Sequence, residues 1–226
     1  MLTNLVLASL LSTQPALPDA PFGAYVEART AAVYAGACHY GAQYTTQGRE
    51  AVVGWSFEGG LFDGVALAGH SVAVILVGDK NLAEADAKVS STVLLDASTS
   101  EAVRGAILGW LEATESELLG DKPTVRVAQA EVRVDGEDYR MRVVDGKRRV
   151  GLKGALLPER ECCVMPYDRW YEPFASVTDS IVGCSDAFVL EEPNSKVRWS
   201  RVQENNAFVA RFGRPIHLAQ AAQPVR

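Results

Sequence analysis

Two Asp-Gly pairs, Asp135-Gly136 and Asp145-Gly146, constrain most strongly what this chain can fold into. They separate three segments in which apolar and polar residues alternate, 124–134, 138–144 and 147–157. An Asp-Gly pair between alternating segments is the strongest short-range hairpin signal, because both of its residues tolerate the positive φ angles of a tight two-residue turn. The sequence therefore predicts an antiparallel meander in this region.

Strands are also predicted outside the meander. Alternation in segment 24–34 separates two faces, with Tyr25, Glu27 and Arg29 on one and Val26, Ala28 and Thr30 on the other. Segments 50–57 and 205–212 alternate in the same way, and the β-branched runs 70–78 and 90–96 are typical of buried strands. Most of the chain is therefore expected to be strand.

One amphipathic helix is predicted in segment 96–120. Ser98, Thr99 and Ser100 are candidate N-caps, and Gly120 and Pro123 end the pattern. The apolar stripe consists of Val103, Ile107, Leu108 and Leu111, and the acidic positions Glu101, Glu112, Glu115 and Glu117 are expected to face water. We therefore predict an α+β fold, mainly antiparallel β-sheet, sandwich-like or an open barrel, with one principal helix.

Length and charge limit the classes of protein. The chain has 226 residues, of which 48% are hydrophobic and 22% charged, and this composition is typical of a folded protein. We expect a single α+β domain over residues 24–213 and a loose tail over 214–226. The formal net charge of −6 argues against nucleic acid as a partner.

The N-terminal region has the pattern of a secretory signal. A short apolar run, Leu5 to Leu11, precedes small and polar residues and Pro15. We predict a signal peptide over residues 1–20 and a periplasmic or secreted protein, with a buried N-terminal helix as the alternative. The next most apolar run, 65–77, is too short to cross a membrane and contains His70, so no transmembrane segment is expected in the mature chain.

Four segments taken in order resemble a known family. They are "GACHYGAQYTTQGREAVVGW", "VLLDASTSEAVRGAILGWL", "ECCVMPYDRWYEP" and "NNAFVARFG". Together the segments resemble the bacterial family called domain of unknown function 1326, over about residues 24–213. The resemblance implies a small bacterial protein without a known activity. Members have several cysteines in the first segment, whereas this chain has Cys38 followed by His39.

Sequence motifs give little support to an enzyme. The chain has no phosphate-binding loop, no zinc-protease motif and no nucleophile elbow, and its only imidazoles are those of His39, His70 and His217. The aromatic residues Tyr167, Trp170, Tyr171 and Phe174 could line a ligand pocket. We interpret them instead as a lid packed across one end of the sheet.

Four cysteines, Cys38, Cys162, Cys163 and Cys184, carry the remaining chemistry. In an oxidising compartment an even number predicts disulfides, with three possible connectivities. Pro158 and Pro166 flank the adjacent pair and argue against a regular strand there, so both sulfurs could turn toward Cys38 and His39. Thiolates with an imidazole suit Zn or Cu(I), so we predict a metal site of Cys38, His39, Cys162 and Cys163. The alternatives are a thiol-disulfide redox enzyme, a disulfide-stapled interaction domain without metal, and unpaired buried thiols.

Overall fold

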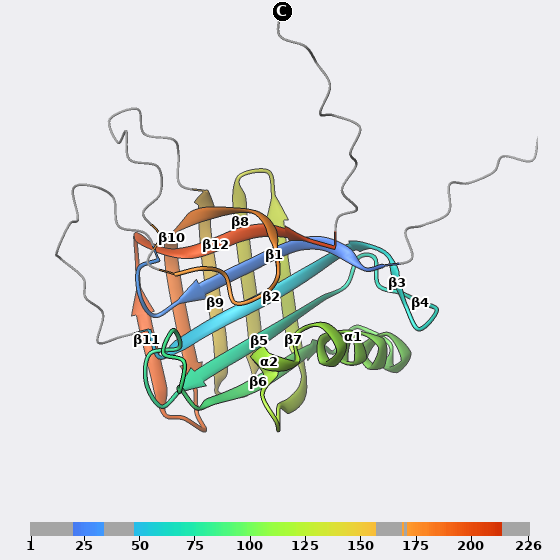
Figure 1. Cartoon of the computed structure of the whole chain (residues 1–226), viewed down its shortest axis with the longest axis horizontal. Helices are drawn as coiled ribbons and strands as arrows, with labels where there is room; N and C mark the ends of the chain where they lie inside the picture. Colours follow the sequence, from blue (N-terminus) through green and yellow to red (C-terminus); the bar gives the residue numbers. More distant parts are fainter. Residues whose placement is uncertain (1–19, 34–47, 157–168, 170, 214–226) are drawn as a thin grey trace, which may run out of the picture.

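A computed structural model describes residues 20–33, 48–156, 169 and 171–213 (Figure 1). Of these residues 58% are in strands and 11% in helices. The strands are β1 (Phe22–Arg29), β2 (Glu50–Gly59), β3 (Leu61–Phe62), β4 (Val65–Ala66), β5 (Ser71–Gly78), β6 (Val89–Asp96), β7 (Thr124–Asp135), β8 (Asp138–Asp145), β9 (Arg148–Leu156), β10 (Thr178–Glu192), β11 (Val197–Arg201) and β12 (Glu204–Phe212). The helices are α1 (Glu101–Thr114) and α2 (Ser116–Leu119).

Nine of the strands close into a barrel, in the order β10-β12-β1-β2-β5-β6-β7-β8-β9 and back to β10. The 15-residue strand β10 makes the closure. Its first half pairs with β12, its middle and second half pair with β9, and its last residues also pair with β11. The predicted α+β fold, sandwich-like or an open barrel, is therefore wrong. The described residues form a mostly β fold, and β10 leaves the sheet no free edge between β9 and β12.

Both predicted hairpins are confirmed. Asp135 is paired with Asp138 and Asp145 with Arg148, and the turn glycines Gly136 and Gly146 have φ angles of 61° and 60°. The meander does not extend to β6, which lies parallel to β7. A parallel neighbour needs a crossover, and α1 and α2 provide it.

Side chains from all nine barrel strands fill the interior. The buried residues of this inner cluster are Val26, Ala28, Val52, Ala73, Ile75, Leu94, Ala128, Ala130, Val132, Tyr139, Met141, Val143, Val150, Leu152, Phe188, Leu190, Ala207 and Val209. Gly54 allows a close approach, because a Cβ at this position would lie 2.7 Å from both Met141 Cε and Val132 Cγ2. The barrel is therefore a packed core.

An ion-pair network lies where β8, β9 and β10 meet at one end of the barrel. Arg148 Nη1 donates to Asp145 Oδ2 over 2.5 Å, and Arg148 Nη2 donates to Glu192 Oε1 over 2.9 Å. Arg126 also donates to Asp145 and, as the main cause, lowers the pKa of that carboxyl. Arg148 and Glu192 are buried, and their mutual pairing allows both charges to stay out of water.

The helix packs on the outer side of the barrel (Figure 1). Ser100 is its N-cap, with Oγ accepting from Val103 N over 3.3 Å. Ile107 and Leu111 are buried as predicted, whereas Val103 and Leu108 are only partly buried. Trp110, which the predicted stripe does not include, packs edge-on against Trp55 and Phe57.

The helix and segment 174–177 give this outer side a second core. Its buried strand residues include Tyr25, Val53, Trp55, Phe57, Val74, Val93, Ala210 and Phe212. The covered strands are therefore apolar on both faces, one turned to the barrel interior and one to the helix. Glu27 and Arg29 lie on the covered face of β1, with the same orientation as Tyr25.

Candidate functional site

The four predicted metal ligands, Cys38, His39, Cys162 and Cys163, lie outside the described residues. So do the predicted signal peptide, almost to its end, and the predicted C-terminal tail. Within the described part of the chain, no group of three or more His, Cys, Asp and Glu side chains could hold a metal ion. The structure therefore bears on the predicted site only through the residues that adjoin it.

Residues that adjoin the two cysteine-bearing segments pack together on β10 and β12. Val33, just before the first segment, forms a cluster with Val182 and Phe208, against which Tyr171 packs. Val33 N also donates to Asn205 O over 2.8 Å. Arg169, just after the cysteine pair, donates to Ser180 Oγ over 2.7 Å and lies over the Phe208 ring. The residue before the first segment and the residue after the second therefore lie at one place on the barrel.

The two other adjoining residues lie in the same neighbourhood. Gly48 O accepts from Leu82 N over 2.9 Å, and the next residue back in that loop, Asn81, donates to Tyr171 Oη over 3.1 Å. Leu156 is paired with Gly183 of β10, next to Val182. All four ends of the two segments therefore lie near the β10–β12 pair or the Tyr171 side chain that covers it.

Cys184 is the cysteine within the described residues, and it lies on the outer face of β10. Gly183 and Ser185 turn inward, since both approach Tyr139 in the barrel interior. Because neighbours in a strand point to opposite faces, half-buried Cys184 points outward, as Val182 does. Sequence analysis left Cys184 out of the predicted site, and it gave no signal for this outward position because it predicted no strand over 178–192.

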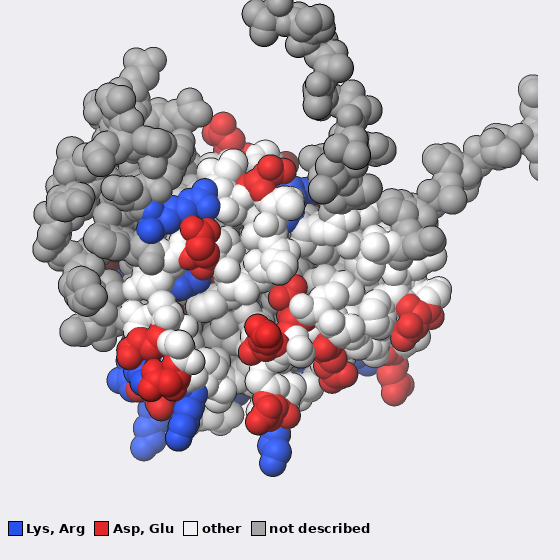
Figure 2. Space-filling model, viewed as in Figure 1, with Lys and Arg blue, Asp and Glu red and all other residues white. Residues whose placement is uncertain are grey.

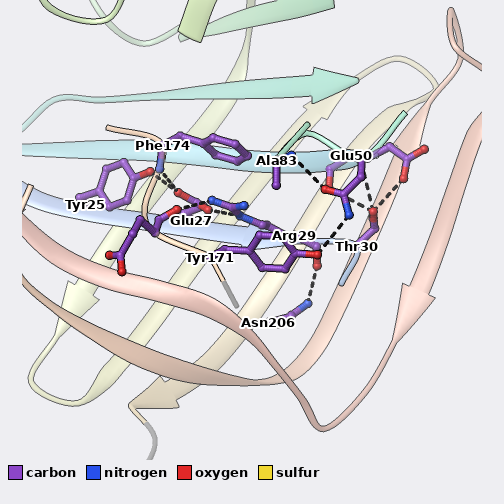
Figure 3. Close-up of polar contacts among 11 residues, drawn as sticks. Tyr25, Glu27, Arg29, Thr30, Glu50, Ala83, Tyr171, Phe174 and Asn206 are labelled. Carbon is purple, nitrogen blue, oxygen red and sulfur yellow. Dashed lines mark hydrogen bonds and ion pairs between the residues drawn. The ribbon is translucent and has the colours of Figure 1, made fainter. Parts of the chain in front are cut away.

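A buried ion pair lies beside this region, on the covered face of β1 (Figure 3). Arg29 Nε donates to Glu27 Oε1 over 2.5 Å, and neither side chain is more than 3% exposed. Tyr25 Oη donates to Glu27 Oε2 over 2.5 Å, and Phe174 N donates to the same oxygen over 2.9 Å. Three donors therefore bond to the carboxylate of Glu27, whose side chain has no exposed surface.

Segment 171–174 covers the ion pair. The guanidinium carbon of Arg29 lies 3.7 Å from the Phe174 ring centroid and 4.7 Å from that of Tyr171, and Nη2 donates to Glu172 O over 2.6 Å. These contacts make Arg29 the anchor of the segment that follows the cysteine pair. Tyr171 and Phe174 thus pack over the barrel, while Tyr167 and Trp170 lie outside the described residues.

The ion pair has consequences for protonation and for the neighbouring strand. Burial, with the nearby Glu27 carboxylate as the second cause, raises the pKa of Tyr25 well above its usual value. The phenol of Tyr25 therefore stays protonated and donates to Glu27.

The backbone of Arg29 is held in place by a neighbouring strand. Its carbonyl accepts from Asn206 Nδ2 over 2.9 Å, and Asn206 Oδ1 accepts from Ser185 Oγ over 2.6 Å.

His70 lies at a separate hollow of about 680 Å³, whose polar lining includes Ser71, Asp96, Ser98 and Arg133. The Nδ1 atom of His70 lies 3.4 Å from Thr99 Oγ1. Asp96 accepts from Ser98 Oγ and from Ala130 N. Because the serine, the imidazole and the carboxylate do not form a relay, this arrangement lacks the geometry of a hydrolase.

Comparison with protein-family models, with curated proteins and with solved structures finds no match to this chain. The described residues define the class by their fold, a closed β-barrel with a packed interior and the two crossover helices α1 and α2 on its outer side. None of the helices that the structure describes is long and apolar enough to cross a membrane.

Proposed function

We propose that this chain is an extracytoplasmic bacterial binding protein that holds a soft metal ion, Zn or Cu(I). Cys38, His39, Cys162 and Cys163 supply the ligands, with the thiolates carrying most of the affinity and His39 completing the shell. We also propose membership of the family called domain of unknown function 1326. The acidic net charge favours a small ligand or a protein over nucleic acid as the partner.

The observation that carries the proposal is the meeting of the segment ends. Val33 and Tyr171 pack in one cluster, and Arg169 stacks on Phe208 of the same cluster. An extended chain spans at most about 3.6 Å per residue, so Cys38 is within about 18 Å of Val33, and Cys163 within about 22 Å of Arg169. The two ligand-bearing segments are therefore tethered closely enough to share one metal ion.

Arg29 supports the same proposal, because a metal site needs ligands that are held in place. The stacked Arg29 guanidinium and the bond from Phe174 N to Glu27 fix segment 171–174 to β1. This anchored segment begins eight residues after Cys163 in the chain.

The alternatives are a thiol-disulfide redox enzyme and a disulfide-stapled domain without metal, and the outward position of Cys184 favours them over unpaired thiols. Cys184 lies on the same face as Val182, beside the tethers of both segments. It could therefore pair with one of the other three cysteines and leave too few thiolates for a metal site.

Metal analysis with a thiol count on protein purified without oxygen tests the proposal. We expect one Zn or Cu per chain with reactive thiols, lost in Cys38→Ser and Cys163→Ser and retained in the matched control Cys184→Ser. Oxidised cysteines without metal would favour the disulfide alternatives. Reduced thiols that bind neither added Zn nor Cu(I) would contradict the metal site.

A further inference from the structure

A second hollow, of about 380 Å³, lies where the β8–β9 turn meets the β10–β11 turn. Its charged lining consists of Lys147, Arg149, Lys196 and Arg198 with Glu191 and Glu192. The hollow is separate from the proposed metal site, because β10 carries Val182 and Cys184 near its start and Glu191 near its end. The chemistry of this lining is therefore considered independently of the cysteines.

The two glutamates do not balance the four cations. Glu192 is already neutralised, because its carboxylate accepts from Arg148 and from Asn194 N. Glu191 is paired across the sheet with both Arg149 and Arg198, and its closest contact to Arg149 is a loose 3.9 Å. One partly exposed carboxylate thus shares the hollow with two lysines and two arginines.

The cations have few partners of their own. Among the described residues, Lys147, Lys196 and Arg198 form no ion pair, and all three are exposed. The excess is local, because the whole chain carries a net charge of −6 (Figure 2 shows acidic side chains spread over α1 and the strands beside it). The cross-strand pairs with Glu191 account for Arg149 and Arg198, but within the described residues they leave Lys147 and Lys196 without a carboxylate of their own.

Lys196 adds a second observation. Its φ angle is 57°, in the left-handed region where a lysine is strained and glycine or asparagine is favoured. The turn therefore keeps a cation at a position where the backbone favours a residue without charge. Asp63, Asp179 and Gln203 have similar φ angles, so the position of the Lys196 charge, and not the backbone angle by itself, supports a ligand at the hollow.

We propose that this hollow binds a phosphate group. Arg149 and Arg198 offer planar forks on either side of Glu191, and such forks match the oxygens of a phosphate in pairs. Lys147 and Lys196 supply two further positive charges. A dianionic phosphate monoester offsets the local excess better than a carboxylate with a single charge. A soluble phosphate ester and a lipid headgroup both carry this group.

Calorimetric titration of the full chain with inorganic phosphate at low salt tests the site. We expect binding that weakens about tenfold in Arg198→Ala, the usual loss for one charged hydrogen bond. The matched control is Arg140→Ala, which removes an exposed arginine from the same sheet at the other end of β8. Equal weakening in the two variants would show an unspecific charge effect and overturn the proposal.

The source of the phosphate is tested with phosphatidylcholine vesicles containing phosphatidic acid. Sedimentation of the wild type with these vesicles, lost in Arg198→Ala, assigns the site to a lipid phosphate. Binding of inorganic phosphate without sedimentation assigns it to a soluble ligand. If the wild type binds neither probe, the proposal is wrong.

Lys196→Gly separates binding from folding. Glycine relieves the left-handed backbone, so the thermal midpoint should rise while phosphate binding weakens about tenfold. A raised midpoint with unchanged phosphate affinity would mean that the lysine has no role in binding, and would overturn the site as drawn.

Discussion

Replacement of Arg29 by methionine removes one partner of the buried Glu27–Arg29 ion pair and leaves the other without it. Glu27 is fully buried and keeps only the bonds from Tyr25 Oη and Phe174 N. Breaking a buried pair costs about 3–5 kcal/mol, and the lost stacking on Phe174 adds to this cost. We therefore expect Arg29→Met to lower the free energy of unfolding by about 4 kcal/mol.

Urea denaturation followed by circular dichroism measures this loss. With a slope of about 2 kcal/mol per molar urea, the midpoint should fall by about 2 M. The double variant Glu27→Leu/Arg29→Met is the decisive control. It leaves no buried charge, so it should be clearly more stable than Arg29→Met alone. A loss under about 0.5 kcal/mol in Arg29→Met would refute the reasoning. So would a double variant whose loss in free energy of unfolding equals the sum of the losses in Glu27→Leu and Arg29→Met made separately.

Three further predictions concern the helix and the N-terminus. Leu111→Ala should destabilise by about 2–5 kcal/mol because Leu111 is fully buried, and Leu108→Ala on the same helix should cost clearly less because Leu108 is only partly buried; equal denaturation midpoints would mean that the helix faces were misassigned. Burial raises the pKa of Glu115 to about 7. Since this folded pKa lies above the ordinary value of 4.5, the protonated form of Glu115 stabilises the folded state relative to the ionised form. This stabilisation is complete below about pH 4.5 and is lost as the pH rises through 7. Glu115→Gln should therefore have a higher thermal midpoint than the wild type at pH 8 and a similar one at pH 4, and parallel pH profiles would contradict this. N-terminal sequencing of protein from the native host should find the mature start between about Gln14 and Gly23, whereas an intact Met1 would contradict the signal peptide.

Much of the secondary structure could be predicted because its causes are local. The two Asp-Gly turns, the alternation from Ala24 to Arg29 and the Ser100 cap each depend on residues within a few positions of one another. Trp110 was missed because an indole at its position can equally lie at the edge of a helical stripe. Only contact with Trp55 and Phe57 makes it part of the core.

The candidate site was predictable in chemistry but not in arrangement. Cysteine and histidine types indicate a soft metal, and this prediction depends on composition alone. The common location of Val33, Arg169 and Leu156 has no local signal, because these residues are far apart in the chain and meet only through β10 and β12. The ion pair of Glu27 and Arg29 was visible as two charges on one face of a strand, but nothing local shows that the face is covered.

The sequence by itself determined eight of the strands, where the hairpins turn and where the helix begins, since these follow from side-chain period and turn chemistry. It did not predict β10 or β11. The tertiary structure alone decided that the sheet closes. Closure depends on β10 pairing with β9 and β12, and bulges interrupt the β10 register. Pairing of this kind joins distant segments, and its free energy depends on the whole set of partners. The same long-range packing decided that Glu27 and Arg29 are buried, because segment 171–174 covers a face that alternation alone leaves open to water.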